Sequence, residues 1–131
     1  MSQSWVKDSA VLAEPRMQSA AATLGSDWVV TGGFNWDFGL EETTNERYSG
    51  SSFTAFDPDI PRGAYRHVVV ALKDGSSLFM AGGNVASDQM HIYSGSSWST
   101  ETTTLPAPRA NVAAGLGSGD RVRYLLVLCK Q

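Results

Sequence analysis

Short apolar runs separated by polar, glycine-rich turns follow one another along the chain. The clearest stretch spans residues 67–83, where the run HVVVAL precedes a Lys-Asp-Gly turn and the run SLFMAGG follows it. Apolar runs of this length bounded by turn residues are typical of β-strands, and a tight turn between two of them predicts a hairpin. Two paired strands are therefore predicted here, followed by a third in QMHIYSG and a fourth around Trp98.

The preceding part of the chain shows the same order of elements. SAAATL, DWVVTGG, NERYSG and SSFTAF, between residues 19 and 56, match the four later runs, with a longer connection over residues 34–44. The alanine-rich run could form a helix in isolation, but Pro15 before it, Gly25 after it and its match to HVVVAL favour a strand. Two further strands are predicted in ANVAAGL and VRYLLVLC.

Several residue types recur once per unit, at steps of 45 to 50 residues. Self-similarity at a fixed spacing indicates repeated supersecondary units. The hexapeptides YSGSSF and YSGSSW are predicted as the hairpin that joins the third strand of each unit to the fourth. The recurring positions are Pro15-Arg16, Pro61-Arg62 and Pro108-Arg109; Gly32-Gly33 and Gly82-Gly83; Tyr48 and Tyr93; and Trp5, Phe53 and Trp98.

A strand that ends in two glycines, then a tyrosine, then an aromatic residue five positions later, with Pro-Arg between units, resembles the kelch motif. The resemblance covers nearly the whole chain and implies an all-β fold of four-stranded antiparallel β-propeller blades. It divides the chain into residues 1–14 as the last strand of a preceding blade, 15–60 and 61–107 as two blades, and 108–131 as the first two strands of a third. Paired glycines suit a close backbone approach, and the aromatic residues suit the wedge between blades.

The predicted ring is incomplete. Eleven strands are predicted, whereas closed propellers contain about four to eight blades of four strands. Two arrangements stay open: the chain is a piece of a longer propeller, or copies of it assemble, with a homodimer as the simplest closed form. Either arrangement covers the strand edges and the apolar run LLVL, which would otherwise favour aggregation.

Composition and charge exclude several classes of function. The net charge is −3, and no segment clusters Lys and Arg with aromatic residues, which argues against nucleic-acid binding. Cys129 is the only cysteine and no Asn-x-Ser/Thr acceptor is present, which fits a reducing compartment. The first 30 residues hold no apolar run of seven, so neither a signal peptide nor a membrane span is predicted. The expected location is cytoplasmic.

The sequence predicts no catalytic, metal or cofactor site. His67, His91 and Cys129 fall on different predicted strands without the close ligand pairs of zinc sites. Counted back from the leucine that ends each first strand, His67 corresponds to Ser19 and Asn111, which indicates a polar strand start. The carboxylates of Glu41-Glu42 and Asp57-x-Asp59 lie in turn-like surroundings. The paired glycines end strands and begin no phosphate-binding motif, and the Tyr/His metal constellation of galactose oxidase-type kelch enzymes cannot be identified here.

A binding surface is predicted from the order of the strands. In an up-and-down sheet, the connection after the second strand and the connection after the fourth emerge on one face, and long loops on rigid scaffolds commonly carry binding. Aromatic residues there are either anchors for a partner or pack back onto the blades, and both alternatives stay open. The candidates are Phe34, Trp36, Asp37, Phe38, Glu41 and Glu42 in the long connection, with Arg16, Arg62 and Arg109.

The expected function is protein or peptide binding, since kelch adaptors present this face to peptides. The resemblance suggests substrate recognition for a ubiquitin-ligase adaptor, or a cytoskeletal scaffold. The alternative is a fragment of a larger kelch-type enzyme or secreted protein whose active site lies elsewhere.

Overall fold

Each predicted group of four strands forms one antiparallel sheet. The computed structural model describes residues 7–84, 88–117 and 122–125, and no α-helix occurs among them. The first sheet has the order β1-β2-β5-β6 and the second the order β7-β8-β9-β10, so consecutive strands of a unit are neighbours. The all-β, antiparallel prediction is confirmed. The first sheet contains β1 (Ala20–Leu24), β2 (Asp27–Thr31), β5 (Asn45–Tyr48) and β6 (Phe53–Ala55); the second contains β7 (His67–Ala71), β8 (Leu78–Gly82), β9 (Met90–Tyr93) and β10 (Trp98–Thr100).

Two further hairpins complete the described strands. The C-terminal hairpin pairs β11 (Ala113–Leu116) with β12 (Val122–Leu125), within the two stretches ANVAAGL and VRYLLVLC that are predicted as strands. Within the long connection of the first unit, β3 (Phe34–Asn35) pairs with β4 (Leu40–Glu41). The sequence predicts a loop over residues 34–44, whereas the structure contains this additional short hairpin.

The repeated hexapeptides form the same hairpin twice, as predicted. Tyr48 pairs with Phe53 across β5 and β6, and Tyr93 pairs with Trp98 across β9 and β10. The connecting Ser-Gly-Ser-Ser turns close through Ser49 N–H to Ser52 O at 3.4 Å and Ser94 N–H to Ser97 O at 3.0 Å. The glycine of each turn has a positive φ, 95° and 90° respectively, which a residue with a side chain adopts only at a cost.

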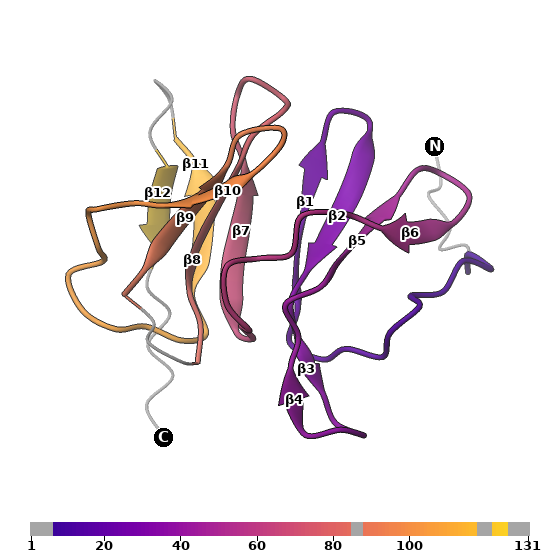
Figure 1. The fold of residues 1–131 in the computed structure, drawn as a ribbon. Helices are drawn as coiled ribbons and strands as arrows, with labels where there is room; N and C mark the ends of the chain where they lie inside the picture. Colours follow the sequence, from indigo (N-terminus) through magenta and orange to yellow (C-terminus); the bar gives the residue numbers. More distant parts are fainter. Residues whose placement is uncertain (1–6, 85–87, 118–121, 126–131) are drawn as a thin grey trace.

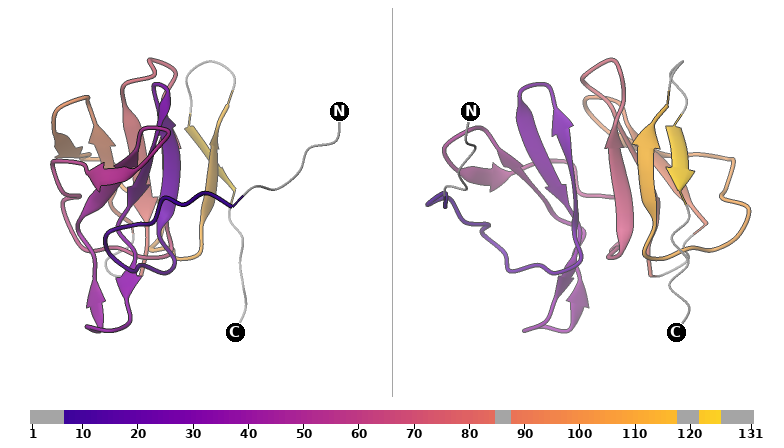
Figure 2. Two further views of the ribbon diagram at one scale, coloured as in Figure 1. Left: turned by 90° about the vertical axis from the view of Figure 1, so that its right-hand side faces the viewer. Right: turned by 180° about the vertical axis from the view of Figure 1, so that it is seen from behind.

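The sheets stand side by side, with their first strands in contact: β1 packs against β7, and β7 packs against β11 (Figures 1 and 2). Between the first and second sheets lies a core of six buried residues. On the other face of the second sheet, Phe79, Ala81 and Leu105 form a separate buried cluster. Because the second sheet is covered on both faces, its first two strands contain the continuous apolar runs VVV and LFMA instead of an alternation of apolar and polar residues. The residues of the first core are Leu24, Val29, Phe56, Val69, Leu78 and Tyr93.

A ladder of backbone hydrogen bonds joins successive units next to their first strands. Gln18, Arg66 and Asn111 each adopt a left-handed conformation, with φ of 56°, 59° and 54°. Arg66 N–H donates to Gln18 O at 2.9 Å, and Asn111 N–H donates to Arg66 O at 3.0 Å. These three residues are therefore equivalent, and the predicted match of His67 with Asn111 is wrong by one residue. His67 corresponds to Val112, because Leu116 lies five residues after its ladder residue whereas Leu24 and Leu72 lie six residues after theirs, so the three leucines are not equivalent.

Part of the predicted organisation lies outside the described residues. Trp5, on which the strand of a preceding blade depends, is one such residue, and residues 7–14 contain no strand. Cys129 and most of the LLVL run also lie outside. In the part of the chain that the structure describes, no helix has the length and apolar composition needed to span a membrane.

Candidate functional site

The β3–β4 hairpin carries large apolar side chains that are exposed to solvent. Trp36 is 76% exposed, Phe38 is 71% exposed and Leu40 is 61% exposed. Isolated apolar residues are common on protein surfaces, but a contiguous exposed group commonly marks an interaction site. The hairpin projects away from the two large sheets, at the edge where the connections between units also lie (Figure 1).

The root of this hairpin is fixed to the rest of the chain. Met17 and Phe34 form an antiparallel bridge, with N–H to O distances of 3.0 and 2.9 Å in the two directions. Glu42 N–H donates to Gly33 O at 2.8 Å. Asn35 is buried, and its Oδ1 accepts a hydrogen bond from Asp37 N–H at 3.2 Å. A rigid root with exposed apolar side chains at its tip is the arrangement in which loops on a scaffold bind partners.

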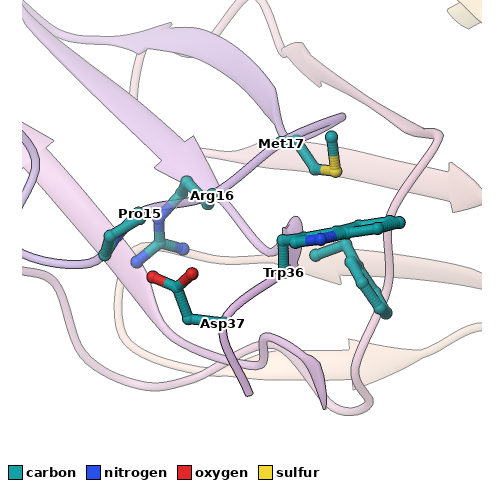
Figure 3. A pocket seen from close by; sticks show the side chains of 6 residues that line it. Pro15, Arg16, Met17, Trp36 and Asp37 are labelled. Carbon is teal, nitrogen blue, oxygen red and sulfur yellow. The ribbon is translucent and has the colours of Figure 1, made fainter. Parts of the chain in front are cut away.

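A shallow hollow lies beside the hairpin, where the chain that enters the first sheet passes (Figure 3). Phe34 and Trp36 meet edge-on, with ring centroids 6.0 Å apart, and Phe34 also contacts the Tyr65 ring at 5.2 Å. Phe34 is thus partly packed, whereas Trp36 stands over the hollow. We call the following residues the hairpin surface: Pro15, Met17, Phe34, Trp36, Asp37, Phe38 and Leu40.

The predicted acidic candidates differ in their surroundings. Asp37 is exposed on the hairpin, and its carboxylate points toward the Arg16 guanidinium in Figure 3. Glu42 is half-buried and accepts a hydrogen bond from Thr44 Oγ1 at 3.3 Å. Glu41, also half-buried, lies close to Gly63 and in electrostatic reach of Arg62. The structure therefore brings the acidic candidates to the same edge as the aromatic ones.

Arg16 has a framework role. Its guanidinium is buried and donates to Gly32 O at 2.7 Å, to Thr44 O at 2.9 Å and to Thr44 Oγ1 at 3.1 Å. It also pairs with the Glu46 carboxylate at 2.8 Å. This side chain clamps the end of β2 to β5, so we assign it to the framework and not to the binding surface.

Glu46 is a structural residue that no sequence pattern identifies. It lies on β5, is 3% exposed, and also accepts hydrogen bonds from Ala13 N–H at 2.7 Å and Glu14 N–H at 3.3 Å. Its carboxylate therefore fixes the segment that precedes the first sheet. The repeat hides this role because the equivalent position on β9, opposite Met80 as Glu46 is opposite Val30, holds His91.

Arg62 occupies the position of Arg16 in the second unit, but without an equivalent acid on the third strand. It donates to Gly82 O at 2.7 Å, as Arg16 does to Gly32 O. Burial lowers the pKa of its guanidinium. Burial lowers the pKa of His91 as well, and the nearby charge of Arg62 adds to that effect. Arg109 is half-buried, and its carbonyl accepts a hydrogen bond from Gly83 N–H at 2.8 Å.

His67 is buried at the start of β7, where it has a structural contact. Its Nε2 lies 2.8 Å from Thr31 Oγ1, and this pair links the second sheet to the first. Burial, together with the charge of Arg62, lowers the pKa of His67 from its ordinary 6.5 to about 4. The imidazole is therefore neutral at pH 7, and its protonation opposes folding.

We expect the chain to lose stability as the pH falls from 7 to 5. Because the pKa of His67 is lower in the folded state, the unfolded chain binds more protons between pH 6.5 and pH 4. Between pH 7 and pH 5 the free energy of unfolding should fall by about 2 kcal/mol, as measured by urea denaturation. His67→Gln, which cannot titrate, should remove most of this pH dependence; an unchanged dependence would assign it to other groups.

No protein-family model matches the chain, and a search of curated proteins finds no match either. Within the described ranges, no cluster of three or more His, Cys, Asp or Glu side chains is arranged to hold a metal ion.

Proposed function

We propose that the chain forms kelch-type β-propeller blades and acts as a protein-binding module. Three observations support the architecture. Each unit is a sheet of four consecutive antiparallel strands, the sheets contact one another through their first strands, and equivalent backbone bonds join the units. Radial repetition of such sheets is the arrangement found in β-propellers.

The paired glycines support the same architecture. A Cβ atom on Gly32 would lie 2.4 Å from Ala64 O and 3.0 Å from the His67 ring. A Cβ atom on Gly82 would lie 3.0 Å from both Arg109 O and a methyl group of Val112. The second strand of each sheet thus ends against the chain that enters the next sheet, as the repeat requires.

The partner binds the hairpin surface. The observation that carries this proposal is the exposure of Trp36, Phe38 and Leu40 on a hairpin whose root is fixed, because aromatic anchors dominate binding energies at interfaces. Asp37, Glu41 and Glu42 lie on and beside the same hairpin, so the partner should combine apolar side chains with basic ones. A peptide-binding surface of this kind would fit both settings that the kelch resemblance suggests, a ubiquitin-ligase adaptor and a cytoskeletal scaffold.

Changing Trp36 and Phe38 together to serine should abolish partner binding and lower the free energy of unfolding by less than about 1 kcal/mol, because both side chains are exposed. Partners are measured by quantitative mass spectrometry after co-precipitation with the wild-type chain, the double variant and Val11→Ser. Val11 is 79% exposed and lies outside the hairpin surface, so this control should retain the partners. A large loss of stability in the double variant would show that the aromatic residues pack on the sheets instead.

A further inference from the structure

The first sheet has one face that no other sheet of the described residues covers. On this face Trp28 is 60% exposed, and Ala21 and Thr23 on the neighbouring strand are exposed as well. Trp28 is opposite Tyr48 in the first unit, as Leu78 is opposite Tyr93 in the second, so Trp28 and Leu78 are equivalent. Leu78 is fully buried, because in the second sheet the corresponding face packs on the first sheet. The two units thus differ in what covers the same face.

The equivalent face of the second sheet is covered, so its contacts indicate which contacts the open face of the first sheet can make. There, Phe56 from the end of the first sheet packs on the Tyr93 ring at 5.3 Å, and Trp98 Nε1–H donates to Pro58 O at 3.2 Å. In the first sheet, Tyr48 and Phe53 occupy the places of Tyr93 and Trp98, and their rings border a hollow of about 350 Å³. Asp8, Ala10 and Trp28 also line this hollow, and the Tyr48 hydroxyl donates a hydrogen bond to the Asp8 carboxylate.

The opposite end of the stack carries the other half of this contact. On β1, Ala20 and Ala22 pack against the core shared with the second sheet. Their equivalents on β11 are Ala113 and Gly115, one and three residues after Val112, and both are exposed. Small residues at alternate positions allow a neighbouring sheet to approach closely, and the C-terminal hairpin presents this pattern to solvent.

The hydrogen-bond ladder between units is open at the same two places. Among the described residues, the Gln18 N–H has no backbone acceptor and the Asn111 carbonyl has no backbone donor. Within the ladder, the N–H of such a residue donates to the preceding unit, and its carbonyl accepts from the following unit. Apolar packing and backbone bonding therefore stop together, at the open face of the first sheet and at the C-terminal hairpin.

We propose that a second copy of this chain covers the open face, with the C-terminal hairpin of each chain packed on the first sheet of the other. The two contacts are equivalent, so the assembly is a closed dimer. Within the described residues, each chain adds two four-stranded sheets and the two-stranded C-terminal hairpin to the stack, so two copies bring six stacked units together, within the roughly four to eight blades of closed propellers. This inference rests on the proposed propeller architecture, but it is independent of partner binding at the hairpin surface.

Light scattering after size-exclusion chromatography tests the proposal on the full chain. The wild-type chain should elute as a discrete dimer. Trp28→Glu, which places a charge on the open face, should weaken self-association at least about 30-fold, the loss expected for a buried tryptophan anchor. Gly115→Glu should have the same effect, and it should leave each monomer folded because nothing lies within 4 Å of a Cβ atom there.

Mixing the two monomeric variants distinguishes this head-to-tail arrangement from a symmetric contact of two identical faces. The mixture retains one unmodified contact and should give a heterodimer, whereas either variant alone should stay monomeric. Trp36→Glu, on the hairpin surface, should leave the dimer intact and thereby separates this proposal from partner binding. A monomeric wild-type chain, an aggregate without discrete size, or a dimer that survives Trp28→Glu would overturn the proposal.

Discussion

Replacing Gly32 by alanine is expected to lower the free energy of unfolding by about 2–5 kcal/mol, because two independent costs add at this position. The φ of Gly32 is +55°, in the left-handed region that disfavours a side chain. The added methyl group would also lie 2.4 Å from Ala64 O, which belongs to the backbone entering the second sheet. Relief of that clash requires the two sheets to separate. The midpoint of urea denaturation, compared with the wild-type value, measures the loss.

A matched glycine separates the two costs. Gly50, in the turn between β5 and β6, has a φ of +95°, but nothing lies within 4 Å of a Cβ atom built there. Gly50→Ala therefore carries the conformational cost alone, about 1–2 kcal/mol. If the Gly32 variant proves no less stable than the Gly50 variant, Gly32 and the backbone at Ala64 lie farther apart than in the structure.

Much of the fold can be predicted from the sequence because each signal occurs twice in phase. An isolated YSGSS segment indicates only a turn, but two copies followed by an aromatic residue fix which strands pair. The alanine-rich run at 20–24 illustrates this point. Its local propensity allows a helix, and only its correspondence with HVVVAL identifies it as the first strand of a sheet. Tertiary context commonly overrides such local preferences.

Repetition also conceals what differs between the units. Glu46 and His91 occupy equivalent places, so comparison of the units suggests a tolerant position, whereas the structure shows Glu46 bonded to a buried arginine. The pairing joins residues 30 positions apart on different segments, and no local pattern marks it. The β3–β4 hairpin escaped prediction for another reason, since its two-residue strands are too short to show any periodicity.

The Pro-Arg pairs illustrate how a candidate binding residue becomes a structural one. Their position between units predicts Arg16, Arg62 and Arg109 on the binding face. In the structure the guanidinium of Arg16 turns inward to the Gly32 carbonyl, just after β2, and Arg62 does the same at the Gly82 carbonyl, at the end of β8. A buried carbonyl next to two glycines needs a donor, and a long side chain can reach it from the preceding connection.

Removing the Glu46 carboxylate is expected to be the other severe change. Glu46→Ala should lower the free energy of unfolding by about 3–5 kcal/mol, because it leaves the buried Arg16 guanidinium without its counter-charge. The same change removes the acceptor for Ala13 N–H and Glu14 N–H, so the segment before the first sheet should also lose its attachment to β5. Urea denaturation measures the first effect, and amide hydrogen exchange of residues 13 and 14 measures the second.

The surface pair of Asp27 and Arg47 provides the control for Glu46. Its atoms are as close, at 2.6 Å, but the Arg47 side chain is 42% exposed, so Asp27→Ala should cost less than about 1 kcal/mol. Changing Arg16 to Met together with Glu46 to Leu removes both buried charges, and this double variant should recover most of the stability that Glu46→Ala loses. Equal losses for Glu46→Ala and Asp27→Ala would mean that solvent reaches Arg16. Without recovery in the double variant, the hydrogen bonds of Arg16 to Gly32 and Thr44, rather than its charge, would be what joins the end of β2 to β5.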